Sequence, residues 1–80
     1  MSEIERVPLE MKPVTSSNIA EIGYLDGFLY VRFVARGGNA GALWRYEAPK
    51  LAFDDLDAAE SVGKAFNALV KDVYPGERVE

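Results

Sequence analysis

The chain of 80 residues contains no cysteine and no histidine. Without cysteine it can form neither a disulfide nor a thiolate nucleophile, and without histidine it lacks the commonest general base and metal ligand. A general base would have to be a carboxylate or a lysine with a strongly shifted pKa, and no residue is marked out for that role. We therefore expect a protein that is not an enzyme and that holds no metal or cofactor.

Long apolar runs are also missing. No segment approaches the ~20 apolar residues that a membrane-spanning helix needs. The N-terminus, Met1–Arg6, is acidic where a secretory leader would be basic and then apolar. Since the absence of cysteine also fits a reducing compartment, we expect a cytoplasmic protein of a bacterium or a phage-infected cell, without membrane contact.

What is present suits one small globular domain, because hydrophobic residues make up 49% of the chain and charged residues 28%. Three runs have the composition of β-strands: Ile19–Leu25, Phe28–Ala35 and Ala42–Ala48. Asp26-Gly27 is typical of a tight hairpin turn, and Arg36–Gly41 predicts a longer one. This glycine-rich segment lacks the Lys-Ser/Thr and the strand-to-helix setting of a phosphate loop. The pattern predicts an antiparallel three-stranded meander.

After the third run the apolar period changes from two to 3.6 residues, which indicates helices. The first is expected from Pro49 or Lys50 to Glu60. The second is expected from Val62 to about Val73, with Ser61 as its N-cap. The predicted fold is therefore α+β, a three-stranded meander followed by two α-helices packed on one face. We assign residues 14–75 to the domain, 1–13 to an acidic N-terminal arm and 76–80 to a C-terminal tail.

Alternation along the strands assigns each side chain to a face. The predicted core consists of Ile22, Tyr24, Leu29, Val31, Phe33, Trp44 and Tyr46, packed under Phe53, Leu56, Phe66, Leu69 and Val70. On the opposite face the same alternation places Ile19, Glu21, Tyr30, Arg32, Leu43, Arg45 and Glu47.

Four short motifs in this order resemble the KTSC domain: Ser16-Ser17-Asn18-Ile19, Ile22-Gly23-Tyr24, Trp44-Arg45-Tyr46 and Ser61-x-Gly63-Lys64-x-Phe66-Asn67. The likeness covers about residues 14–75. Trp44 stands where the family has the first tyrosine of a Tyr-x-Tyr pair, and Tyr46 matches the second. The family takes its name from the C-terminal extension of some lysyl-tRNA synthetases, so the resemblance implies a binding domain for which RNA has been suggested as a ligand.

The predicted solvent-exposed sheet face holds the ingredients for contacting RNA or tRNA. Tyr30 would stack on a base, and Arg32 and Arg45 would hold phosphates. Lys64 and Asn67 would add to this surface from the start of the second helix. The competing interpretations are that Glu21 and Glu47 simply pair with the two arginines, and that the start of the helix is only capped and packed.

Acidic residues cluster on the first predicted helix, at Asp54, Asp55, Asp57 and Glu60. Their spacing matches no calcium-binding loop, and a solvated helix face explains them. The alternative function is a protein–protein adaptor or phage-type inhibitor that docks this acidic surface on a nucleic-acid-handling protein. The overall charge of −4 fits that alternative and opposes sequence-independent binding to nucleic acid.

Overall fold

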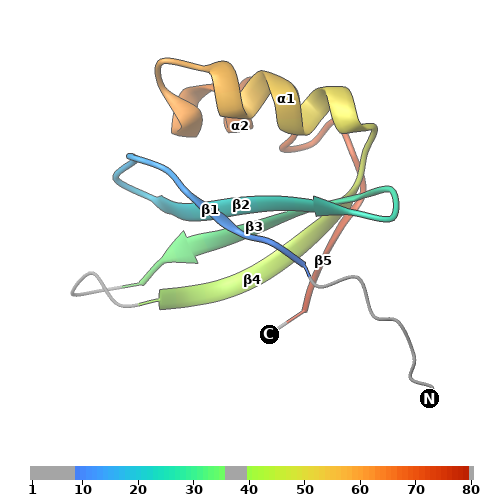
Figure 1. The fold of residues 1–80 in the computed structure, drawn as a ribbon, viewed down its shortest axis with the longest axis horizontal. Coiled ribbons are helices and arrows are strands. Elements are labelled where there is room, and N and C mark those ends of the chain that lie inside the picture. The colour runs from blue at the N-terminus through green and yellow to red at the C-terminus, as the bar shows by residue number, and fades with distance from the viewer. Residues whose placement is uncertain (1–8, 36–39, 80) are drawn as a thin grey trace.

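The computed structural model describes residues 9–35 and 40–79. They form a five-stranded antiparallel sheet in the order β1-β2-β3-β4-β5, and the two helices cover one of its faces (Figure 1). The elements are β1 (Lys12–Pro13), β2 (Ile19–Leu25), β3 (Phe28–Val34), β4 (Ala40–Glu47), α1 (Lys50–Ala58), α2 (Val62–Leu69) and β5 (Gly76–Arg78). The α+β class, the central meander and the two helices on one face are thus confirmed.

The hairpin between β2 and β3 turns at Asp26 and Gly27, as expected. Both residues have positive φ angles, 52° and 84°, which is the backbone that an Asp-Gly hairpin turn provides. The turn sets the register, so that Tyr24 lies opposite Leu29 and Leu25 lies opposite Phe28.

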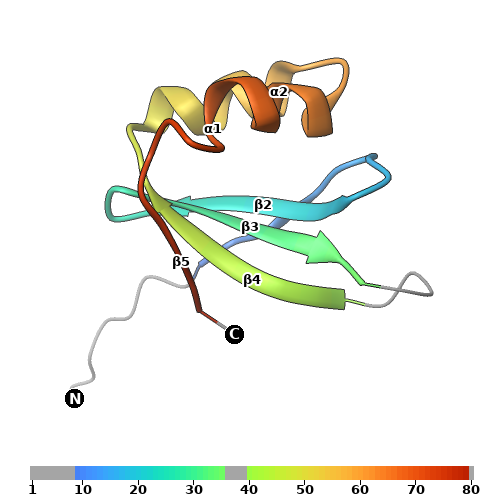
Figure 2. The same ribbon diagram turned by 180° about the vertical axis from the view of Figure 1, so that it is seen from behind.

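The prediction of three strands was wrong, because a short strand is added at each edge. β1 pairs with β2, and β5 returns after the helices to pair with β4 (Figure 2). Two and three residues are too few to display an alternating pattern. β1 and β5 lie in the segments that the sequence analysis set apart as arm and tail.

A β-bulge changes the face of Ile19. The register between β2 and β3 shifts between Ile19 and Glu21, so that Ala20 is an extra residue on β2. Strict alternation would put Ile19 on the face opposite Ile22. With the bulge, both side chains belong to the core and both are fully buried. The prediction for Ile19 was wrong because alternation assumes an unbroken strand.

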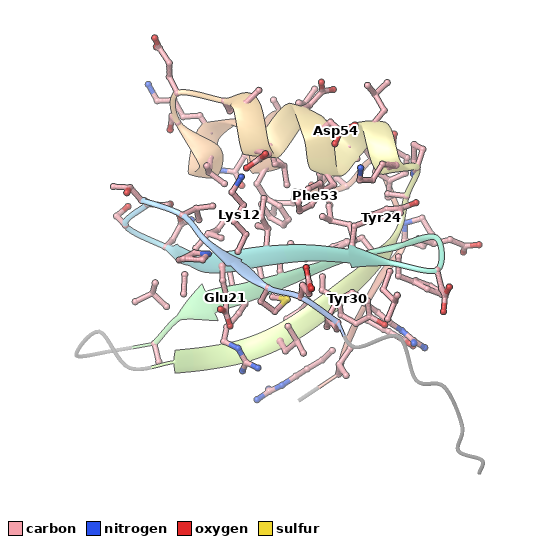
Figure 3. The ribbon with its side chains drawn as sticks, viewed as in Figure 1. Lys12, Glu21, Tyr24, Tyr30, Phe53 and Asp54 are labelled. Atoms are coloured by element: carbon pink, nitrogen blue, oxygen red, sulfur yellow. The ribbon has the colours of Figure 1, made fainter. Side chains whose placement is uncertain are left out.

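Most of the predicted core is confirmed. The buried members are Ile22, Leu29, Val31, Tyr46, Leu56, Phe66 and Val70, and the half-buried members packed against them are Tyr24, Phe33, Trp44 and Phe53. Figure 3 shows Tyr24 and Phe53 between sheet and helices, and Glu21 and Tyr30 on the other side of the sheet. The hydroxyl of Tyr24 donates to the carbonyl of Ala48 at 2.7 Å, where β4 leads into α1.

Helix α2 ends at Leu69, one turn earlier than predicted. Asp72 adopts a left-handed conformation with a φ of 64°, and the N–H of Lys71 reaches back to the carbonyl of Phe66. Leu69 is 41% exposed, so its place in the predicted core was wrong, and Val73, beyond the end of the helix, is 56% exposed. Leu43, expected on the solvent side of the sheet, is buried there instead.

Residues 9–11 cover part of the sheet face that is turned away from the helices. A Cβ atom on Gly23 would lie 2.7 Å from the sulfur of Met11 and 2.8 Å from the carbonyl oxygen of Glu10. Lys12 then ties the segment to α1 through an ion pair with Asp57 at 2.7 Å. This face is therefore less open than alternation alone suggests.

Two leucines of α1 give a matched test of this packing. Leu56 is fully buried and Leu51 is 64% exposed. Because a deleted core side chain loses both its burial and its neighbours, we expect Leu56→Ala to lower the free energy of unfolding by about 2–5 kcal/mol. Leu51→Ala should change it by less than about 0.5 kcal/mol. Urea titration followed by circular dichroism measures both, and equal losses would contradict the helix orientation.

Candidate functional site

The two arginines on the sheet face away from the helices (the outer face) each have a carboxylate partner. The Nε atom of Arg32 donates to Glu21 at 3.3 Å, and its Nη1 atom donates to the carbonyl of Gly41 at 3.0 Å. The expectation that Glu21 pairs with an arginine across the strands is confirmed.

Arg45 pairs with Glu77 of β5 rather than with Glu47. Its Nε atom donates to Glu77 at 2.6 Å, and its guanidinium lies 4.6 Å from the centre of the Phe28 ring. The pKa of Arg45 is raised above its usual value by hydrogen bonds to Glu77 and Tyr30. A shallow hollow beside Arg45 is lined by Phe28, Glu47 and Glu77. The two carboxylates would repel a phosphate there.

Helix α1 ends at Ala58, so Glu60 lies beyond the helix on which it was predicted, and half of the acidic cluster is paired. Asp57 contacts Lys12 at 2.7 Å, and Asp54 contacts Lys50 of its own helix at 3.3 Å. Asp55 and Glu60 are exposed. Across residues 9–35 and 40–79, no three acidic side chains are arranged to hold a metal ion.

Lys64 and Asn67 lie apart from the other three candidate nucleic-acid contacts. Tyr30, Arg32 and Arg45 are on β3 and β4 and face away from the helices, whereas Lys64 and Asn67 belong to α2. Their hollow, which we call the polar hollow, is lined by Ser16, Ser17, Asn18, Ser61, Gly63, Lys64 and Asn67. The candidate residues therefore do not form one surface.

A second hollow adjoins the first and runs between α2 and the sheet. This aromatic groove has a volume of about 320 Å³ and is lined by Asn18, Phe33, Trp44, Tyr46, Phe66, Asn67 and Lys71. It continues past Trp44 and Lys71 to Asp72 and Tyr74. The volume is at the lower end of the range for small-molecule pockets, so the groove suits one or two flat rings better than a large cofactor.

The aromatic rings of the groove form one packed group. Trp44 stacks on Tyr46 with ring centres 6.3 Å apart and planes within 20°. Phe66 meets Tyr46 edge-on at 5.5 Å and Phe33 edge-on at 5.6 Å. Burial raises the pKa of Tyr46, so its phenol is neutral. Trp44 is half-buried and lines the groove, so part of its ring borders the space that a ligand would occupy.

The polar side chains at the end of the groove are held by the turn before β2. The hydroxyl of Ser16 donates to Oδ1 of Asn18 at 2.9 Å and accepts from the N–H groups of Asn18 and Ile19. Ser61 caps α2 by accepting from the N–H of Lys64, as predicted. Within the described part of the chain, Lys64 and Lys71 have no ion-pair partner.

Sequence reasoning missed this groove because it treated Trp44, Phe33 and Tyr46 only as core. The available signal was the presence of small polar residues in both the motif at 16–18 and the motif at 61–67. Of the predicted glycine-rich loop at 36–41, residues 36–39 lie outside the described residues, and Ala40 and Gly41 belong to β4 instead.

Known proteins resemble this chain in sequence and in fold. No family model matches the chain. A protein of Tsukamurella paurometabola is 46% identical over 63 residues, covering 76% of this chain and 88% of that protein. The crystal structure of a KTSC domain protein from Yersinia pestis matches with a TM-score of 0.75 and 26% identity, over 91% of this chain and 100% of that one.

The fold therefore defines a small α+β domain in which a helical pair inserted between β4 and β5 covers one face of an antiparallel meander. In this fold and in the four motifs of its sequence, the chain is similar to KTSC domain proteins. Within the residues described, no helix is both long and apolar enough to span a bilayer.

Gly63 tests the contact between the two motifs. Its Cβ substituent would lie 2.8 Å from Oδ1 of Asn18, so alanine must displace that amide and break its bond with Ser16. In an Asn18→Ala background the closest atom is gone and the Ser16 hydroxyl, 3.3 Å from the added Cβ, need shift by only a few tenths of an ångström, so the higher helix propensity of alanine should stabilise the fold by up to about 1 kcal/mol. In the parent, Gly63→Ala should give no such gain. A double-mutant cycle by urea unfolding measures the difference, and additive effects would contradict the contact.

Proposed function

We propose that this protein is a non-enzymatic, cytoplasmic binding module of bacterial or phage origin, which takes up a single-stranded segment of RNA or tRNA in the aromatic groove. The observation that carries the proposal is the position of Trp44. Its ring lines the groove and its continuation toward Tyr74, while Lys71 borders both and Lys64 lies in the adjoining polar hollow.

The groove offers the two interactions on which single-strand binding depends. A base stacked on an aromatic side chain contributes about 1–3 kcal/mol to the binding free energy, whichever base it is. Lys64 and Lys71 form no ion pair within the described chain and attract the phosphates on either side, while Asp72 lines the continuation of the groove beside Lys71 and partly offsets that attraction. Since the net charge of the chain is −4, binding should use only a few phosphates and depend strongly on stacking.

The outer face has weaker support as the RNA contact. An RNA phosphate there would compete with Glu21 for Arg32 and with Glu77 for Arg45. The guanidinium of Arg45 also lies against the Phe28 ring, 4.6 Å from its centre. Stacking and charge are therefore better combined in the groove.

The adaptor or inhibitor function has weaker support as well. It needs a concentrated negative surface on α1, but lysines partly neutralise Asp54 and Asp57. Of the four acidic residues in this cluster, only Asp55 on α1 and Glu60, which follows the helix, have no such partner among the described residues.

Charge-neutralising variants test the groove. Lys64→Gln and Lys71→Gln should each weaken binding to a short fluorescent single-stranded RNA. Each should also lower the salt slope of log K by about 0.7, because one fewer counterion is released. Lys50→Gln is the matched control, since Lys50 is an exposed lysine on α1 that already pairs with Asp54. Fluorescence anisotropy at several salt concentrations gives both quantities.

The same titration separates the two faces. Arg32→Ala and Arg45→Ala should leave the affinity within about twofold if the groove is the site. Loss of binding in these variants, together with normal binding by the lysine variants, would move the RNA to the outer face. No RNA binding by the parent protein at low salt would exclude the proposal.

A further inference from the structure

We infer that a second copy of this chain docks on the side of the two helices that faces away from the sheet, with α1 of each copy lying over α2 of the other. The inference goes beyond the proposed function and does not depend on it. It rests on an exposed apolar patch and on two charged side chains that have no ion-pair partner in the part of the chain that the structure describes. One two-fold axis brings these features into register.

The apolar patch consists of Leu51, in the first turn of α1, and Leu69, the last residue of α2, which are 64% and 41% exposed. The chain leaves the sheet at the start of α1 and returns to it after α2, so the two leucines lie at the same end of the helical pair (Figure 1, Figure 2). An isolated exposed leucine is common on a protein surface, whereas two at adjoining helix ends form a patch that association can bury.

The contacts of α1 show that Leu51 and Asp55 lie on the side of this helix that is turned toward α2 and solvent. Leu56 is fully buried against the sheet, and Asp57 reaches the other way, to Lys12 of β1. Leu51 and Asp55 are four residues apart, so they share one stripe of the helix, and both are exposed.

Helix α2 presents Lys64 and Ala68 outward and Leu69 toward α1. Phe66 is buried against the sheet, and Asn67 borders the aromatic groove beside β4. At about 100° per residue, Leu69 falls on the opposite flank of the helix from Asn67. Lys64 and Ala68 fall on the side opposite Phe66, and the small side chain of Ala68 lets another helix approach closely.

Asp55 and Lys64 carry opposite charges on this surface, and neither has an ion-pair partner within residues 9–35 and 40–79. Along the helix axes Asp55 lies about 6 Å from Leu51, and Lys64 lies about 7.5 Å from Leu69. Because both leucines are at the same end of the helical pair, the two charges lie at nearly equal distances from that end.

A two-fold axis parallel to the helices makes this surface complementary to itself. It places α1 of one copy over α2 of the other, so that Leu51 meets Leu69 and Asp55 meets Lys64, each contact occurring twice. A two-fold axis across the helices would instead place α1 over α1 and bring Asp54 and Asp55 of both copies together. Like charges at close range are unfavourable, so the charge pattern selects the first arrangement.

The interface is small, since each copy contributes one side of two helices of nine and eight residues. Small interfaces give weak, reversible complexes, and we expect a dissociation constant on the order of 100 µM. The chain is therefore monomeric at the low micromolar concentrations of a binding titration. Lys64 also lines the polar hollow, so RNA and a second copy compete for this lysine.

Sedimentation equilibrium of the full chain between about 10 µM and 1 mM tests the dimer, because the average mass should rise from that of the monomer toward twice that value. Leu51→Ser should raise the dissociation constant at least about tenfold, since it removes the central apolar contact in both halves of the interface. Val79→Ser is the matched control. Val79 is 45% exposed and follows β5, away from the helices (Figure 2), so the dissociation constant should stay within about twofold.

Charge exchange tests which helix lies over which. Asp55→Lys and Lys64→Glu should each weaken self-association at least about tenfold, because each variant places like charges opposite one another twice. An equimolar mixture of the two variants should associate within about threefold of the parent, because each pair in the mixed dimer again joins a lysine to a carboxylate. Glu47→Lys on β4 makes the same change of net charge at an exposed position away from this surface and should have no such effect. Circular dichroism confirms that each variant is folded.

Three results would overturn the inference. The first is a chain that stays monomeric up to about 1 mM. The second is a dimer that Leu51→Ser or the single charge variants leave intact, since its interface would then lie elsewhere. The third is loss of association in the charge variants that their mixture does not restore, since α1 would then not lie over α2 of the second copy. None of these results bears on RNA binding.

Discussion

The position of helix α2 depends on the side chain of Phe66. Its ring meets Tyr46 of β4 and Phe33 of β3 edge-on, at 5.5 Å and 5.6 Å, and only 4% of the residue is exposed. Edge-to-face geometry places the positive ring edge against a negative ring face, so these contacts add orientation to burial. These contacts fix the position of α2 against the sheet beside the aromatic groove, which Phe66 also lines. The same ring is thus part of the core and part of the floor of the candidate site.

A second constraint brings together two motifs that are far apart in the sequence. The turn at 16–18 touches the start of α2 because Gly63 has no side chain, and Oδ1 of Asn18 occupies the space where a Cβ would be. A glycine near the start of an eight-residue helix costs helix propensity. The cost is offset by a contact that orients Asn18, while Ser61 satisfies the first turn of the helix. The contacts that pack the turn at 16–18 against α2 therefore also position side chains of the candidate site.

The sequence predicted those parts of the structure that rest on repeated local patterns. Apolar alternation identified β2 to β4, Asp26-Gly27 identified their first turn, and the change of period identified both helices. The bulge at Ala20, which buries Ile19, could not be predicted because it breaks the pattern that the prediction uses. β5 escaped for a different reason: its residues are exposed, and its pairing with β4 comes from the path of the chain after α2. The pairing of Glu77 with Arg45 could not be predicted for the same reason, because Glu77 lies on β5.

The same distinction explains why the candidate site was predicted only in part. Lys64 and Asn67 were identified from a motif, but alternation assigned Trp44 simply to the core. A half-buried ring at the edge of a core both packs and contacts solvent, and the period of a strand cannot separate these roles. The net charge is likewise a poor guide to the charge near the groove. The net value of −4 describes the whole chain, yet over a Debye length of about 8 Å at physiological salt a ligand responds mainly to nearby side chains. The charges nearest the groove are Lys64, Lys71 and Asp72, and neither lysine has an ion-pair partner within the described chain, so the local charge is positive although the net charge is negative.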